Sequence, residues 1–167
     1  MLKKVLLSLG SNLGDRSLYI KKAMDELATL SELKILSRSS VMETSPIGVT
    51  GQQNYLNAVL FVETTMEPLR LLKELKAIEQ RLGRKFRVRW AEREIDIDIL
   101  IYEGVTLKVP ELCLPHKEFT NRLFALKGAA ELWPEGVIGE YNSTVKSLYL
   151  SRKEELCKDQ IVLDTKW

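Results

Sequence analysis

Residues 83–100 of the chain, GRKFRVRWAEREIDIDIL, join a basic loop directly to a β-strand. Isoleucine occupies every second position from Ile95 to Ile101, and Asp96 and Asp98 lie at positions between them. Because successive side chains of a strand point to opposite faces, the isoleucines are predicted to enter a core and both carboxylates to share the other face. At a rise of roughly 3.3 Å per residue, the two aspartates begin about 6.6 Å apart.

The loop before this strand carries a cluster of cations: Arg84, Lys85, Arg87, Arg89 and Arg93. Two carboxylates on one face repel each other unless a cation compensates, and this spacing suits two metal ions about 3.5–4 Å apart. Mg²⁺ together with arginine is the usual equipment for binding nucleotide phosphates. The alternative is a solvated strand face beside a solvated loop. The combination of paired carboxylates and five cations favours a phosphate-handling site.

Composition places few other constraints on function. The 167 residues are 45% hydrophobic and 29% charged, which predicts one globular domain over residues 1–167. A net charge of +2 does not favour a nucleic-acid or membrane partner. Cys113 and Cys157 form no metal-ligand pattern and indicate no disulfide framework. The first apolar run is too short for a signal peptide, and no run approaches about 18 apolar residues, so a cytoplasmic protein is expected.

Periodicity predicts an alternation of strands and helices along the chain. Strands are expected over residues 4–9, 33–44, 55–65, the aspartate segment up to Tyr102, and 105–109. Residues 10–15, GSNLGD, have turn chemistry, and Asp15 can cap a helix. A second helix is expected to follow Glu67-Pro68, and a third to span 121–132; the apolar stripe of the second is Leu69, Leu72, Leu75, Ile78 and Leu82. The order is that of a ferredoxin-like α+β fold, a mostly antiparallel sheet with helices packed on it, plus extra carboxyl-terminal elements.

Seven motifs in order resemble those of the 6-hydroxymethyl-7,8-dihydropterin pyrophosphokinase family of folate biosynthesis. They are GSNLGDR (10–16), ETSPIG (43–48), YLNAV (55–59), IEQRLGR (78–84), RW (89–90), REIDIDIL (93–100) and LPHKEFTNRLF (114–124). The resemblance implies an enzyme that transfers pyrophosphate from ATP to the hydroxymethyl group of a reduced pterin and releases AMP. It also implies that Asp96 and Asp98 bind two Mg²⁺ ions, and that Arg84 and Arg93 join them as catalytic residues.

The resemblance further assigns residues to two substrates. Tyr55 and Phe124 would stack on the two faces of the flat pterin, a role that competes with plain core packing. The other residues at pterin-pocket positions are Thr44, Pro46, Ile47 and Asn57. The residues at ATP positions are Glu79, Arg84, Trp90, Arg93, His116 and Arg122. The lone histidine could equally make a structural hydrogen bond, and Glu79 is expected to orient an arginine rather than to accept a proton. The substrates are the only expected partners, and the chain is expected to be a monomer.

One motif departs from the family pattern. The family often has Trp-Gly-Pro-Arg where this chain has Trp90-Ala91-Glu92-Arg93, which changes the backbone freedom of the loop. Either Arg87 or Arg89 could contact phosphate, and the spacing does not decide between them. Two other classes remain open: a ferredoxin-like nucleic-acid-binding module that uses the basic loop, and a Mg²⁺-dependent phosphodiesterase that uses water as the acceptor.

Overall fold

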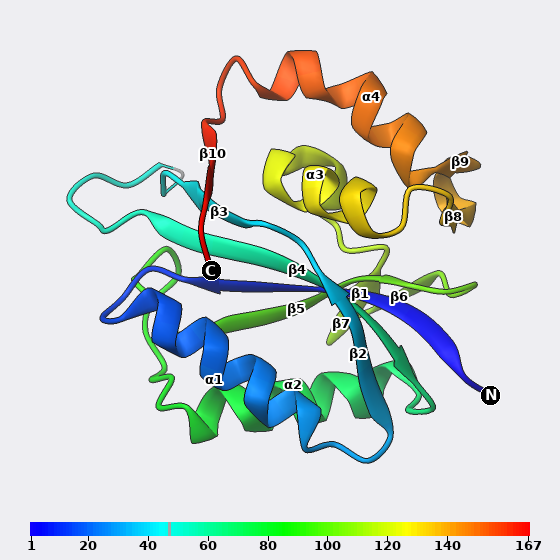
Figure 1. Ribbon diagram of the computed structural model, residues 1–167, viewed down its shortest axis with the longest axis horizontal. Coiled ribbons are helices and arrows are strands. Elements are labelled where there is room, and N and C mark those ends of the chain that lie inside the picture. The colour runs from blue at the N-terminus through cyan, green and yellow to red at the C-terminus, as the bar shows by residue number, and fades with distance from the viewer. Residues whose placement is uncertain (47) are drawn as a thin grey trace.

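A computed structural model describes residues 1–46 and 48–167 (Figure 1). The main elements in chain order are β1 (Lys3–Ser11), α1 (Arg16–Ala28), β2 (Leu33–Arg38), β3 (Val41–Thr44), β4 (Tyr55–Thr64), α2 (Pro68–Arg81), β5 (Asp96–Tyr102), α3 (Leu123–Leu132), α4 (Val145–Leu156) and β10 (Val162–Thr165). Shorter elements are β6 (Leu107–Val109), β7 (Leu112–Leu114), β8 (Val137–Ile138) and β9 (Ser143–Thr144), and two 3₁₀ turns at Phe119–Asn121 and Gly139–Tyr141.

The main sheet has the order β10-β3-β4-β1-β5, and β2 pairs with β4 beyond the end of β3. Every pairing in it is antiparallel. With β2 and β3 counted as two halves of one strand, the arrangement is the ferredoxin-like fold that the sequence predicts.

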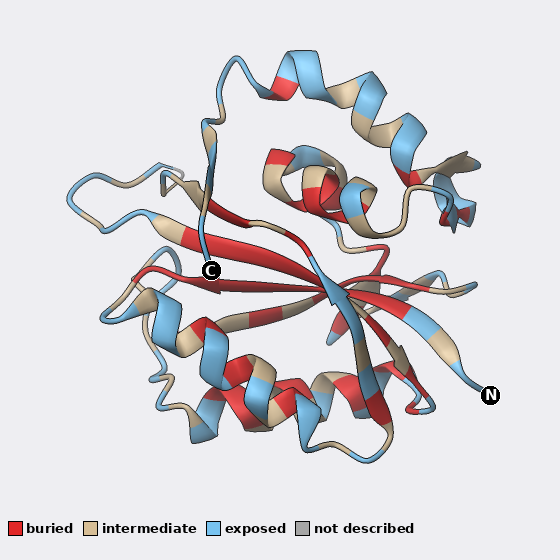
Figure 2. Ribbon diagram, in the orientation of Figure 1, coloured by how far each residue is buried: buried red, intermediate tan, exposed pale blue. Residues whose placement is uncertain are grey.

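Helices cover both faces of this sheet (Figure 1). Helices α1 and α2 lie on one face, whereas α3 and α4 lie on the other. The central strands therefore alternate between two cores: Leu7 and Leu9 of β1 pack with the first pair of helices, and Leu6 packs with the second. Figure 2 shows the buried residues concentrated in the central strands and on the sheet-facing sides of the helices.

Several boundaries differ from the sequence predictions for identifiable reasons. The strand expected over 33–44 is divided at Ser39, whose hydroxyl accepts a hydrogen bond from the backbone of Val59 and replaces a regular ladder bond. Ile101 packs in the second core rather than with Ile97 and Ile99, because the register between β1 and β5 shifts at Leu6/Leu7.

Two further predictions need correction. Gly10 and Ser11 continue β1 instead of starting the turn, because both pair with β4. Leu69 is 48% exposed, and the buried stripe of α2 runs through Leu71, Leu75 and Ile78. Among residues 1–46 and 48–167, no helix is both long enough and apolar enough to cross a lipid bilayer.

Candidate active site

The predicted carboxylates project from the start of β5 on the face covered by α3. Ile97 and Ile99 pack with α1 and α2, so Asp96 and Asp98 face the opposite way. The sheet register places Asp96 opposite Gly10 of β1, and Gly10 opposite Asn57 of β4. One row across the sheet therefore connects the proposed metal ligand with a proposed pterin residue.

Gly10 leaves the middle of that row without a side chain. A Cβ at this position would lie 3.0 Å from Oδ1 of Asn57 and 3.7 Å from Cδ1 of Tyr55. The close approach of the Asn57 amide and the Tyr55 ring to the backbone of Gly10 thus depends on the missing side chain. Gly10 was expected from the sequence only in a turn, and this close approach was not predicted.

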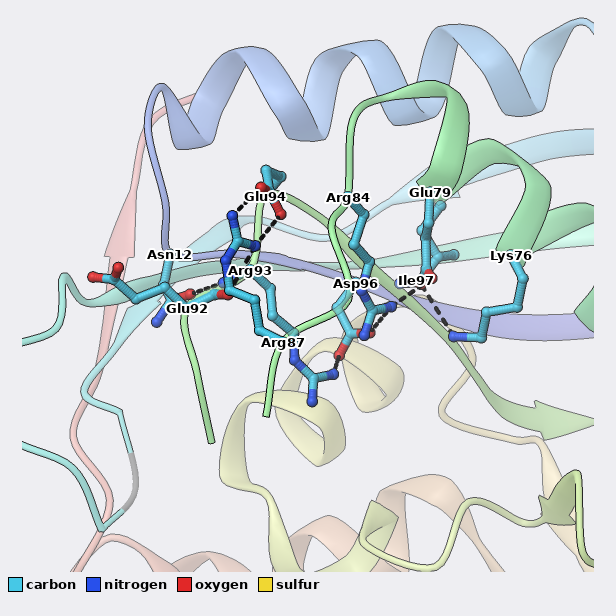
Figure 3. Close-up of polar contacts among 10 residues, drawn as sticks. All are labelled: Asn12, Lys76, Glu79, Arg84, Arg87, Glu92, Arg93, Glu94, Asp96 and Ile97. Atoms are coloured by element: carbon cyan, nitrogen blue, oxygen red, sulfur yellow. Dashed lines mark hydrogen bonds and ion pairs between the residues drawn. The ribbon is translucent and has the colours of Figure 1, made fainter. Parts of the chain in front are cut away.

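Asp96 is held by two arginines in the structure (Figure 3). Nη1 of Arg84 lies 2.9 Å from its Oδ1, and Nη1 of Arg93 lies 3.2 Å from its Oδ2. Both arginines belong to residues 83–95, the segment between α2 and β5 that we call the arginine loop. Arg84 and Arg93, which were both assigned to the ATP phosphates, therefore converge on the carboxylate of Asp96.

Asp98 differs sharply from its neighbour. Across residues 1–46 and 48–167, its carboxylate forms neither an ion pair nor a hydrogen bond. Burial raises the pKa of Asp98, and the nearby charge of Asp96 raises it further, while Lys76 and His116 act in the opposite direction. An ionised Asp98 therefore lacks the compensation that a cation would provide.

Glu79 ties α2 to this edge of the sheet. It is 2% exposed and accepts hydrogen bonds from Nη1 of Arg84 at 2.5 Å and from the backbone N–H of Ile97 at 2.7 Å. Lys76 adds an ion pair at 3.1 Å. Burial raises the pKa of Glu79, and the hydrogen bond and cations oppose that rise. These contacts agree with the expected role of Glu79 as a partner that orients an arginine.

His116 lies beside the strand that carries Asp96 and Asp98, because its backbone N–H donates to the carbonyl of Leu100 at 2.8 Å. Its Nδ1 accepts from the backbone N–H of Glu118 at 3.1 Å, and burial lowers its pKa. A neutral ring with an occupied Nδ1 carries its proton on Nε2, which is then a donor. Arg122, just before α3, contributes positive potential to both Asp98 and His116.

The predicted pterin residues lie along β3, β4 and the start of α3. Nδ2 of Asn57 donates to Oγ1 of Thr44 at 2.8 Å. Tyr55 is half-buried and lies within the field of Arg93, Asp96, Arg122 and Arg84, while burial raises its pKa.

The other three residues assigned to the pterin are Phe124, Pro46 and Ile47. Phe124 is half-buried in the first turn of α3 and packs against the second core, and its contact with the pterin stays a prediction. Pro46 lies two residues beyond the end of β3. Ile47 falls outside the residues that the structure describes.

A hydrogen-bonded bridge that the sequence analysis missed connects three loops. Asn12 accepts from the backbone N–H of Arg93 at 2.8 Å and donates to Oε1 of Gln52 at 3.2 Å. Gln52 in turn donates to the carbonyl of Trp90 at 2.8 Å. Trp90 is itself 57% exposed, and its contact with ATP stays a prediction.

Two carboxylates on one strand face together with convergent arginines are typical of an enzyme that transfers phosphate groups from a nucleotide. Residues 6–134 match the family model described as 7,8-dihydro-6-hydroxymethylpterin-pyrophosphokinase (HPPK). The chain belongs to this family, whose members are transferases of folate biosynthesis.

Relatives named 2-amino-4-hydroxy-6-hydroxymethyldihydropteridine pyrophosphokinase share much of the chain. The one from Methylorubrum extorquens is 39% identical over 136 residues, which are 81% of this chain and 86% of the relative. The one from Bacillus subtilis is 36% identical over 126 residues, or 75% of each chain. The bifunctional protein FolKE of Lactococcus lactis is 35% identical over 164 residues, but this chain spans only 47% of its length.

Solved structures support the fold. A Plasmodium falciparum HPPK-DHPS crystallised with pteroate superposes with a TM-score of 0.75 over 95% of this chain and 44% of that chain, at 17% identity. The present chain thus spans about half of the bifunctional proteins and most of the shorter relatives.

Proposed function

We propose that this chain transfers the pyrophosphoryl group of ATP to the hydroxymethyl group of 6-hydroxymethyl-7,8-dihydropterin and releases AMP. Family membership and the names of its relatives support the reaction. The structural observation that carries the proposal is the row from Asp96 through Gly10 to Asn57, which brings a carboxylate paired with two arginines near the Asn57 amide and the Tyr55 ring. The space beside Gly10 is the proposed pterin slot.

The donor set fits Mg²⁺. Asp96 and Asp98 supply hard carboxylate oxygens from one strand face, and Asp98 has no partner within the described residues. No group of three or more His, Cys, Asp or Glu side chains gathers there in the described part of the chain. The protein therefore provides two ligands, and ATP phosphates and water would complete the coordination. When bound, Mg²⁺ neutralises phosphate charge and lowers the cost of attack at phosphorus.

The arginines change partners as ATP binds. Arg84 and Arg93, now paired with Asp96, have planar forks that suit phosphate oxygens equally well. Transfer of the two arginines to the triphosphate releases Asp96 for the metal and keeps every charge paired. Nε2–H of His116 and the guanidinium of Arg122 supply further donors to the phosphates.

The pterin enters the slot beside Gly10. Asn57 and Thr44, already hydrogen-bonded to each other, present donor and acceptor groups to the pterin edge, and Tyr55 offers a ring face. The hydroxymethyl oxygen forms a bond to the β-phosphorus while the bond from that phosphorus to the α,β-bridging oxygen breaks. AMP leaves with the bridging oxygen, and the hydroxyl proton passes to solvent. Positioning and charge neutralisation account for the rate enhancement, without a covalent intermediate.

Product analysis tests this proposal. The protein is incubated with ATP, Mg²⁺ and 6-hydroxymethyl-7,8-dihydropterin, and nucleotides are separated over time. We expect one AMP for each pterin consumed, no AMP without pterin, and a kcat lowered about a hundredfold or more in Asp98→Asn. AMP formed at the same rate without pterin would favour the phosphodiesterase alternative, and ADP as the product would contradict transfer of pyrophosphate.

A further inference from the structure

We propose that Arg87 is a positioning residue whose ion pair with Glu94 folds the arginine loop back on itself, so that Arg89, rather than Arg87, is available to the triphosphate. This inference rests on the proposed function for its link to ATP. It concerns two residues to which the reaction described above assigns no role.

The contacts of Arg87 close the loop into a ring (Figure 3). Its Nη1 and Nη2 donate to Oε2 and Oε1 of Glu94 at 2.8 and 2.7 Å, a two-pronged contact. Nη1 also lies 3.4 Å from the carbonyl of Glu92. One side chain from the outgoing half of the loop therefore holds two residues of the returning half.

This pair should persist when nucleotide binds. The Glu94 side chain is only 7% exposed, and removal of the partner of a buried carboxylate leaves a charge with neither water nor a counterion. Arg87 would incur that penalty by moving to a phosphate. Arg89 has no such tie, since its contact in the described part of the chain is the ring of Trp90, with the guanidinium carbon 4.9 Å from the ring centroid.

The pair also divides the loop into a fixed stem and a tip, and the tip is tied to the rest of the chain by the hydrogen bond from Gln52 to the carbonyl of Trp90. Arg84 is tied to Asp96 at one end of the stem, and the backbone of Arg93 is tied to Asn12 at the other. The tip beyond Arg87 is a turn closed by the backbone hydrogen bond from Ala91 to Val88. It contains Trp90 at φ 71°, a left-handed conformation that a residue with a side chain rarely adopts.

A fixed stem matters for catalysis because it carries both Arg84 and Arg93. Arg84 and Arg93 must reach the same phosphate group together, and a misplacement of about 1 Å can cost a hundredfold in rate. With Arg87 bound to Glu94, the two arginines keep their spacing whether the tip is open or closed. When ATP binds, movement is then confined to residues 88–91 and to the side chains of Arg84 and Arg93.

The test compares Arg87→Ala, Glu94→Ala and the double variant in steady-state kinetics. If the pair acts as one positioning unit, each single change lowers kcat about tenfold, and the double variant is no worse than the worse single one. Arg87→Lys, which keeps the charge but loses the fork, should recover part of the rate. The matched control removes the exposed pair Arg70–Glu32, which joins other elements, and should leave kcat unchanged.

The sign of the Glu94→Ala effect is decisive. If Arg87 were a phosphate ligand restrained by Glu94, its release would lower KM for ATP, and Arg87→Ala would raise it; that opposite pair of results would overturn the proposal. Unchanged kinetics in both single variants would overturn it as well. Arg89→Ala is expected to raise KM for ATP several-fold with normal loop protection.

Hydrogen exchange gives a readout independent of catalysis. In the ligand-free wild-type protein, slow exchange should extend over the stem, residues 84–87 and 92–94. A non-hydrolysable ATP analogue should add protection at residues 88–91. In Arg87→Ala, residues 84–94 should all exchange faster, and equal exchange in variant and wild type would refute the stem. If the wild-type protein makes no AMP, the proposed function fails, and this exchange experiment still decides the structural role of Arg87.

Discussion

The substitution Gly10→Ala tests the location of the pterin slot with a single methyl group. The new Cβ would lie 3.0 Å from Oδ1 of Asn57, closer than an ordinary van der Waals contact, and 3.7 Å from the Tyr55 ring. Asn57 cannot turn away freely, because its Nδ2 donates to Thr44 at 2.8 Å. The Asn57 amide must therefore shift within a site where the pterin needs it in place.

The magnitude follows from two terms. A misaligned hydrogen bond to the buried pterin costs about 1 kcal/mol, and the extra methyl group costs about 1–3 kcal/mol through overpacking. A total of about 2–4 kcal/mol corresponds to a rise in Kd for the pterin of roughly thirtyfold to several-hundredfold. The variant should still fold, because the φ of Gly10 is not in the left-handed region and Gly→Ala offsets about 0.4–1 kcal/mol of the overpacking through the unfolded chain.

Calorimetric titration measures the Kd of the pterin and the Kd of the ATP analogue. Pterin is titrated in the presence of a non-hydrolysable ATP analogue, and the analogue is titrated alone. We expect weaker pterin binding, an unchanged Kd for the analogue, and normal behaviour from the control Gly139→Ala, which adds a Cβ with no atom within 4 Å. A folded Gly10→Ala variant that binds pterin within threefold of the wild type would refute the slot.

Three further changes have distinct expected outcomes. Asp98→Asn should raise the melting temperature of the ligand-free protein, since it removes a carboxylate whose ionised form is disfavoured by burial, and should lower kcat about a hundredfold or more; lower melting temperature with retained activity would contradict this. Hydrogen bonds from Arg87 lower the pKa of Glu94 from 4.5 to about 2, so the stabilising effect of its charge is present above pH 4.5 and is lost as pH falls toward 2. Chemical unfolding should therefore show that the difference in free energy of unfolding between wild type and Glu94→Gln decreases as the pH falls from 4.5 toward 2. A difference that does not change with pH would exclude this linkage. Tyr55→Ala and Phe124→Ala should each raise Kd for pterin about fivefold, from about 1 kcal/mol of aromatic contact, and a selective loss of ATP binding in titrations would reverse the assignment of the two pockets.

The alternation of isoleucine and aspartate in the sequence was sufficient to predict how the two carboxylates lie on β5. The pattern of Ile97, Asp98 and Ile99 predicted which face of β5 carries the carboxylates, because a period of two has only one solution when the partner face is buried. The same rule misplaced Ile101, since a shift in pairing between two strands leaves no mark in the sequence of either one. The ferredoxin-like order was confirmed, whereas α4 and β10 could not be delimited because their apolar faces are short and interrupted.

Contacts between loops that are distant in the sequence could not be predicted from sequence patterns. The bridge from Asn12 to Gln52 joins residues 40 positions apart in segments with ordinary turn composition. Arg87 and Arg89 occupy equivalent positions in an alternating basic run, and only the position of Glu94 in three dimensions distinguishes them. A glycine such as Gly10 looks the same in the sequence whether it lies in a turn or in a strand that a ligand approaches closely, so its position could not be predicted.

Binding of Mn²⁺ as a stand-in for Mg²⁺, followed by electron paramagnetic resonance, tests the central claim most directly. Because the protein supplies only Asp96 and Asp98 within the described residues, metal binding should be weak without nucleotide. With a non-hydrolysable ATP analogue and pterin, we predict two bound Mn²⁺ ions per chain, and loss of protein-bound metal when both aspartates are changed to alanine. Tight Mn²⁺ binding without nucleotide, or an unchanged stoichiometry in the double variant, would contradict the account.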